Sequence, residues 1–202
     1  MAMLVNGGTP GRSFGKGSFL AAVTTFWAAS ASAQVVEGPS LVLFGGQMTD
    51  NHWEETLTPW DIDFLGSHFV GLGIGYEWPS RLPRTGIGIE AQMVAHFGRQ
   101  DHLELNLPLV IRYYPDQPLL PGLESLAFGI GLSRTTKDPQ TEIDRDGETS
   151  KTLVYWMGEL AFNLPSDNTD LILRLHHRSD AYGLMDTDSG SNALALGVRR
   201  RF

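Results

Sequence analysis

Apolar and polar residues alternate with a period of two over most of the chain. The clearest case lies between residues 102 and 114, where every second position holds a large apolar or aromatic side chain: Leu103, Leu105, Leu107, Leu109, Ile111 and Tyr113. Because successive side chains of a strand point to opposite faces, this period is typical of a strand with one apolar face. The same alternation predicts eight strands, at 40–47, 68–78, 85–97, 102–114, 124–135, 152–164, 170–179 and 191–202. Only the first strand is ambiguous, because residues 41–44 are all apolar.

The positions opposite these large side chains are often glycine, as at Gly71, Gly73, Gly75, Gly129 and Gly131. A soluble eight-stranded barrel, such as a lipocalin, is the alternative, but it turns its large apolar residues inward. Glycine opposite large side chains instead favours a barrel whose large residues face lipid and whose small residues fill a narrow interior. The sequence therefore predicts an all-β fold, an eight-stranded antiparallel transmembrane β-barrel.

The first 33 residues differ from the rest of the chain. Arg12 and Lys16 precede an apolar stretch at 19–29, which is followed by Ala31, Ser32 and Ala33. The apolar stretch is shorter than the roughly 20 residues of a transmembrane helix. We therefore expect a signal peptide at 1–33 and one outer-membrane barrel domain at 34–202.

Composition excludes several classes of function. The formal net charge of −8 argues against a nucleic-acid partner. The chain has no cysteine, which rules out disulfides and zinc sites of the cysteine type. Residues 34–202 also lack the HExxH, GxSxG and phosphate-loop motifs, and their acidic clusters, such as Asp144, Asp146 and Glu148, lack the spacing of a calcium loop. We expect neither a cofactor nor a metal.

The predicted connections alternate in length. If the chain enters the barrel from the periplasmic side, the turns are 79–84, 115–123 and 165–168, and the outer loops are 48–67, 98–101, 136–151 and 180–190. This order largely follows the short inner turns and long outer loops of such barrels. Aromatic residues near the strand ends are expected to form interface girdles: Trp53, Trp60, Trp78, Tyr113, Tyr114 and Tyr182.

A base and a nucleophile stand near the end of the seventh predicted strand. His177 and Ser179 share the parity of Leu171, Leu173 and Leu175, so they should project outward at the external rim. A histidine can take the proton of a serine that attacks an ester and return it to the leaving alkoxide. The simpler alternative is that both are solvated rim residues.

A third polar group can orient the histidine. Asn192 on the last predicted strand shares the outward face of His177, and its amide oxygen can accept the imidazole N–H. Asp186 and Asp188 in the preceding loop are competing candidates. His176 points the other way, and we expect it in a polar network of the interior with Arg174 or Glu159.

The run His177-Arg178-Ser179-Asp180-Ala181-Tyr182-Gly183, followed by Asn192-Ala193-Leu194, resembles the active-site region of the lipid A 3-O-deacylase (PagL) family. Phe44-Gly45-Gly46 through Thr49-Asp50-Asn51, with Trp53 and Thr56-Leu57, resembles that family's first strand and loop. The resemblance implies an eight-stranded outer-membrane barrel with a catalytic site on its outer wall, with His177 as base and Ser179 as nucleophile.

Two positions depart from the family pattern. Asp180 replaces the asparagine of the motif, and Asn192 stands about where the family has a glutamate. A carboxylate at Asp180 would oppose a developing oxyanion unless it is turned away, and a neutral Asn192 stabilises an imidazolium less than a carboxylate does. Backbone N–H groups from Ala181 to Gly183 are the expected oxyanion donors.

The resemblance implies an outer-membrane serine esterase, with Ser179, His177 and Asn192 as catalytic residues. It would remove the 3-O-linked hydroxyacyl chain from lipid A of lipopolysaccharide in a Gram-negative outer membrane, with the site at the extracellular leaflet. Phe202 resembles the terminal aromatic residue of that class of barrels. The alternatives are a non-enzymatic barrel for adhesion or envelope stability, and a phospholipid acyl hydrolase or acyltransferase. Membrane lipids are further expected partners, and a homodimer is an alternative to a monomer.

Overall fold

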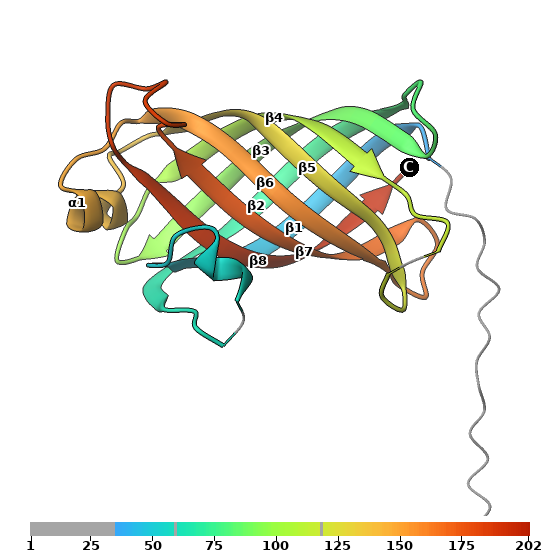
Figure 1. Ribbon diagram of the computed structural model, residues 1–202, viewed down its shortest axis with the longest axis horizontal. Coiled ribbons are helices and arrows are strands. Elements are labelled where there is room, and N and C mark those ends of the chain that lie inside the picture. Colours follow the sequence, from blue (N-terminus) through green and yellow to red (C-terminus); the bar gives the residue numbers. More distant parts are fainter. Residues whose placement is uncertain (1–34, 59, 118) are drawn as a thin grey trace, which may run out of the picture. The chain divides into compact units, whose positions relative to one another are not determined.

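The computed structural model describes residues 35–58, 60–117 and 119–202. Eight antiparallel strands close into a barrel in chain order, β1 to β8 (Figure 1). They are β1 (Gly38–Thr49), β2 (Phe64–Pro79), β3 (Thr85–Gly98), β4 (Leu103–Tyr113), β5 (Leu123–Thr135), β6 (Thr152–Asn163), β7 (Thr169–Ser179) and β8 (Gly190–Arg201). The predicted eight-stranded antiparallel barrel is confirmed. The expected signal peptide at 1–33 lies outside the described residues.

The strand ends match the alternation closely, with one clear exception. β2 begins at Phe64 rather than at 68, because its pairing with β1 continues past a bulge between Gln47 and Thr49 to the pair Thr49 and Phe64. The first long loop is shorter than predicted for this reason. It contains a 3-10 helix at Glu55–Leu57, and the loop between β5 and β6 contains α1 (Gln140–Asp146). Strand periodicity predicts neither helix. Among the described residues, no helix is long and apolar enough to cross a membrane.

Large apolar side chains cover the outside of the barrel. Along β4, the outward aliphatic side chains are all exposed, with Leu109 exposed by 62%. The ambiguous first strand follows the same rule, because Leu41 and Leu43 face outward and Val42 and Phe44 are buried inside. A soluble barrel would bury such residues, whereas a barrel that crosses a membrane presents them to lipid.

The interior carries charged groups in compensating pairs. Arg174 is fully buried, donates from Nε and Nη2 to Glu159 at 3.0 and 2.5 Å, and donates from Nη1 to Glu90 at 2.9 Å. Arg112 and Arg199 approach the other oxygen of Glu159 at 2.8 and 3.5 Å. Buried charges are costly unless they are paired and hydrogen-bonded, and this network satisfies that condition.

His176 faces the interior as predicted, but its expected partner was wrong. Its Nε2 lies 3.1 Å from Glu104, which His96 also contacts at 2.8 Å, and no hydrogen bond joins it to Arg174 or Glu159 among the described residues. The register explains this difference. His176 lies two positions along β7 from Arg174, so its side chain enters the interior at a different position along the barrel axis.

Glycines that face the interior make room for aromatic rings as well as for polar side chains. A Cβ added to Gly71 on β2 would overlap the ring of Phe44, and one added to Gly46 on β1 would overlap the ring of Phe69. Both rings are buried in the apolar part of the barrel interior. The glycine positions therefore determine where large residues fit inside a narrow barrel.

Alanine at Gly71 should lower the free energy of unfolding by about 1–3 kcal/mol, the usual cost of overpacking a filled core. The matched control is Gly158→Ala, because a Cβ at that glycine meets nothing within 4 Å and its cost should stay within about 0.5 kcal/mol. Unfolding of the purified barrels in detergent, followed by the loss of heat-modifiable migration on a gel, compares the two. Equal stability of both variants would contradict this account of the interior.

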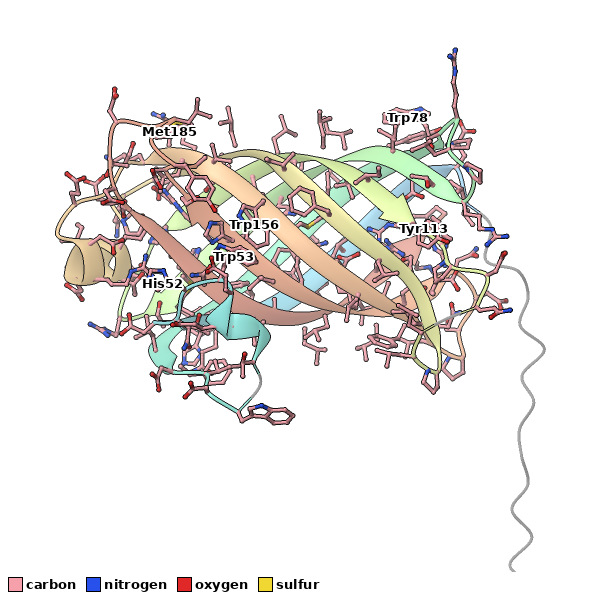
Figure 2. The ribbon with its side chains drawn as sticks, in the orientation of Figure 1. His52, Trp53, Trp78, Tyr113, Trp156 and Met185 are labelled. Carbon is pink, nitrogen blue, oxygen red and sulfur yellow. The ribbon has the colours of Figure 1, made fainter. Side chains whose placement is uncertain are left out.

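Aromatic side chains lie near both ends of the barrel. Figure 2 shows Trp78 and Tyr113 toward the end with the short turns, and Trp53 in the half of the barrel that carries α1, beside Trp156. Trp78, Tyr113, Trp60 and Tyr182 are all exposed, as the girdle prediction requires. Tyr114 was wrongly included, because it is fully buried and its hydroxyl donates to Glu77 at 2.7 Å.

Candidate functional site

The candidate site lies on the outer wall of the barrel, near the end that carries the long loops and α1. His177 on β7 and Asn192 on β8 are register partners. Both share the outward parity of Leu173 and Leu196, which are exposed. The imidazole Nδ1 and the Asn192 Oδ1 are 2.5 Å apart, so the structure places these two residues in direct contact, as the predicted register required.

A second contact determines how the Asn192 amide is oriented. Its Nδ2 donates to the backbone carbonyl of Asn51 at 2.8 Å, which leaves Oδ1 to face the histidine. Because an amide oxygen only accepts, Nδ1 of His177 carries the hydrogen of that bond. The other ring nitrogen, Nε2, then has a free lone pair and can act as a base.

The loop between β1 and β2 covers the pair from outside. Asn51 closes this loop, since its Nδ2 donates to the carbonyl of Asp61 at 2.9 Å and its Oδ1 accepts from the backbone N–H of Asp63 at 2.7 Å. In Figure 1 the loop, in teal, lies next to β8 and projects below the barrel in this view. His177 is only 8% exposed although it faces outward, and Asn192 is 3% exposed.

Two tryptophans complete the cover of the imidazole. Trp156 on β6 lies against His177, with ring centroids 4.5 Å apart, and Trp53 from the β1–β2 loop meets Trp156 edge-on at 5.5 Å. Figure 2 shows Trp53 and Trp156 next to each other on this face. The alternation along β6 places Trp156 on the outward face, and the pairing of β6 with β7 makes it the register partner of His177.

Ser179 opens onto the same cavity as His177 and Asn192. The cavity has a volume of about 150 Å³ and is lined by His52, Trp53, Arg145, Asp146, His177, Ser179, Asp180, Asp188, Ser189, Gly190, Ser191 and Asn192. The Ser179 hydroxyl oxygen accepts the backbone N–H of Ala181 at 3.3 Å, so its own hydrogen is free to be donated. Among the described residues, no hydrogen bond joins Ser179 to His177.

The turn after Ser179 differs from the expected oxyanion site. Ala181, Tyr182 and Gly183 all have positive φ, at 54°, 58° and 85°, a conformation that the two non-glycine residues adopt at an energetic cost. Asp180 stabilises it, because its Oδ2 accepts the N–H of Gly183 at 2.6 Å. Ala181 already donates to Ser179, so of the three N–H groups at residues 181–183 only that of Tyr182 has no hydrogen-bond partner among the described residues. The prediction of donors from Ala181 to Gly183 is therefore reduced to one group.

An ion pair from α1 forms another side of the cavity. Arg145 donates from Nε to Asp146 at 2.8 Å and also contacts the carbonyl of Gly190. Burial alone raises the pKa of the Asp146 carboxyl, but hydrogen bonds from Arg145, Gly190 and Ser189 outweigh it and hold this pKa below its ordinary value. The carboxylate therefore stays charged at neutral pH. The sequence placed this segment in the outer loop 136–151 and did not indicate its part in the cavity.

The competing acidic residues do not orient the histidine. The backbone N–H of Asp188 donates to Glu148 at 2.8 Å, and the group bonded to His177 is Asn192 rather than Asp186 or Asp188. Within the described part of the chain, no three histidine or carboxylate side chains gather in a way that could hold a metal ion.

An apolar groove of about 780 Å³ runs along the outer wall beside this cavity. It is lined by Trp53, Thr56, Ile62, Leu126, Ala127, Phe128, Trp156, Gly158, Glu159, Leu160, Leu173, Leu175, Tyr182 and Leu194. Trp53 lines both the groove and the polar cavity, so the two spaces adjoin at this residue. A polar cavity with a base and a hydroxyl, next to a long apolar groove, has the layout required to hold an ester with a fatty chain.

No family model matches the chain, and no curated protein matches it. Among solved structures, the chain is similar to the crystal structure of the outer membrane enzyme PagL, with a TM-score of 0.59 and 13% sequence identity over 81% of this chain and 99% of that one. It also matches a de novo designed transmembrane β-barrel, with a TM-score of 0.47 and 11% identity over 84% of this chain and 99% of the design. At 13% identity, the likeness to PagL shows a common barrel fold.

Proposed function

We propose that this protein is an outer-membrane serine esterase that removes the 3-O-linked hydroxyacyl chain from lipid A of lipopolysaccharide. One observation carries the proposal. His177 and Asn192 are hydrogen-bonded on the lipid-facing wall, at the cavity that Ser179 also lines, and an apolar groove leads away from that cavity. The outward face of a membrane barrel is an unusual place for an ionisable side chain, and the cover that the β1–β2 loop and two tryptophans provide for His177 argues for a functional role.

The first step is attack by Ser179 on the ester carbonyl. Nε2 of His177 accepts the hydroxyl proton while the Ser179 Oγ forms a bond to the carbonyl carbon. Ser179 and His177 share one face of β7 two positions apart, and catalytic hydrogen bonds often close only when substrate is bound. Asn192 keeps the ring in the reactive tautomer, and Trp156 limits its rotation.

The second step expels the sugar alkoxide. The protonated His177 donates its proton to the leaving oxygen as the carbon–oxygen bond breaks, which leaves the acyl group on Ser179. A water molecule, activated by the same nitrogen, then hydrolyses this acyl-enzyme. The N–H of Tyr182 is the available backbone donor for the oxyanion, and the charged Asp146 at the cavity edge must stay paired with Arg145 to limit repulsion.

The proposed location follows from the same arrangement. The exposed apolar wall suits a bilayer, and a Gram-negative outer membrane is where lipid A is found. With the long loops on the extracellular side, the cavity would lie at the level of the lipid A ester bonds, and the groove would receive the acyl chain to be released.

Mass spectrometry of lipid A tests the proposal. Lipid A from cells that express the chain should lose one hydroxyacyl group relative to cells with an empty vector. Incubation of the purified barrel with lipid A and, separately, with phospholipids distinguishes the activities. Unchanged lipid A with cleaved phospholipids would favour a phospholipid acyl hydrolase, and no change in either lipid would favour a non-enzymatic barrel.

Alanine in place of Asn192 should lower kcat for acyl release by about 100-fold, because the imidazole loses the group that orients it. The matched control is Asn163→Ala, since that exposed amide lies at the opposite end of the barrel and contacts Glu124. Initial rates on purified lipid A measure the effect. A full rate in Asn192→Ala would remove this residue from the proposed mechanism.

A further inference from the structure

Gly158 interrupts a column of bulky side chains on the outside of β6. Trp156 and Leu160 stand on either side of it along the strand, and all three line the apolar groove. Phe128 on β5 and Leu175 on β7 are its register partners. A Cβ added at Gly158 meets no atom within 4 Å, so these neighbours leave the space above the glycine open. Gly158 therefore forms a notch in the floor of the groove.

Neither packing nor backbone conformation requires glycine at this position. Gly131 on β5 shows the usual case, since a Cβ there would overlap the backbone of Leu107. Gly158 has no such contact, and it does not have the positive φ that favours glycine at Gly183. The property that glycine supplies here is the empty space itself.

The register shows how far the notch lies from the proposed nucleophile. Ser179 on β7 pairs with Val154 on β6, and Gly158 is four positions farther along that strand. At a rise of roughly 3.3 Å per residue, the separation along the strand is roughly 13 Å. An extended alkyl chain advances roughly 1.3 Å per carbon, given carbon–carbon bonds of about 1.5 Å, so about ten carbons span this distance.

We propose that Gly158 sets the length of acyl chain that the site accepts, by letting chains longer than about ten carbons continue along the groove. The occupant is the unbranched acyl chain of the ester under attack, because the groove adjoins the cavity of Ser179 and the two share Trp53 as a lining residue. This inference rests on the proposed function. A side chain at Gly158 would block the floor of the groove and leave the part nearer to Ser179 free.

The first experiment compares 4-nitrophenyl esters with acyl chains of four, eight and fourteen carbons. In Gly158→Leu, kcat/KM for the fourteen-carbon ester should fall by at least about 10-fold, and the values for the two shorter esters should stay unchanged. The matched control is Gly45→Leu on β1, whose Cβ has ordinary room and which does not line the groove. Heat-modifiable migration verifies that each variant is folded. An equal loss for all three esters, or no loss for any, would overturn the inference.

A second readout does not need hydrolysis. The chain has no cysteine, so Gly158→Cys and the control Gly45→Cys each carry a single thiol. A sixteen-carbon fatty acid should slow modification of the thiol in Gly158→Cys by a maleimide in detergent at least about 3-fold, and a four-carbon acid should not. The thiol of Gly45→Cys should react at the same rate in both. Protection without any ester hydrolysis would support the groove and refute the esterase, and equal rates with both acids would overturn the inference.

Discussion

Alanine in place of Ser179 should lower the rate of acyl release from lipid A by about 10⁴-fold or more. The physical reason is that the hydroxyl oxygen forms the covalent bond of the acyl-enzyme, and an alanine side chain has no oxygen with which to form that bond. Loss of a nucleophile of this kind removes most of the catalysis and leaves what substrate binding alone provides. Mass spectrometry of lipid A incubated with the purified variant measures the residual rate.

The control for this change is Ser189→Ala. Ser189 lines the same cavity, but its hydroxyl donates to Asp146 at 3.1 Å, so its removal should cost less than about 10-fold. Both variants should retain the stability of the parent barrel. If Ser179→Ala releases acyl chains at the rate of Ser189→Ala, then Ser179 is not the nucleophile and the proposed mechanism fails, whichever lipid is cleaved.

Methionine in place of Arg174 should lower the free energy of unfolding by about 3–5 kcal/mol. Arg174 is fully buried and pairs with Glu90 and Glu159, so its removal leaves one carboxylate uncompensated and the other with less compensation in the barrel interior. Removal of one partner of a buried ion pair costs far more than the pair contributes, because the remaining charge stays out of water. Urea unfolding of the barrel in detergent micelles provides the measurement.

Arg99→Met is the matched control for this change. Arg99 also pairs with a carboxylate, that of Asp144 at 2.8 Å, but both side chains are more than 40% exposed to solvent. Exposed pairs of this kind contribute about 0–1 kcal/mol. If Arg174→Met were no less stable than Arg99→Met, the interior network would not be a main source of the barrel's stability.

Local sequence pattern determines one part of the candidate site, and tertiary contacts determine the other. Parity alone places His177, Ser179 and Asn192 on one face, and the hairpin between β7 and β8 makes His177 and Asn192 neighbours. The contact of Asn192 with the backbone of Asn51 joins positions 141 residues apart in the chain, and no local pattern indicates it. The same holds for Trp53, which reaches the site only because the β1–β2 loop folds over the barrel wall.

The local sequence was misleading where a residue's partner depends on its position along the barrel axis, and not only on whether its side chain points inward or outward. His176 was assigned to the interior correctly, yet its partner is Glu104 on β4. Tyr114 follows the exposed Tyr113 by one residue and so takes the opposite face, where it bonds to Glu77. The short helix α1 lies outside the strand pattern altogether, and its role in forming the cavity depends on the ion pair of Arg145 and Asp146.

Alternation of side chains along the chain by itself determined the number of strands, their order and the outward-facing lipid surface, because the period of a strand is local and a barrel with antiparallel neighbours follows from short connections. Only the tertiary structure decided that the base is shielded by two tryptophans, that its orienting amide is held by a loop backbone, and that the groove has an open notch at Gly158. These features depend on how far apart the strands and loops lie in three dimensions. That spacing comes from the shear and closure of the barrel and not from the pattern of any single strand.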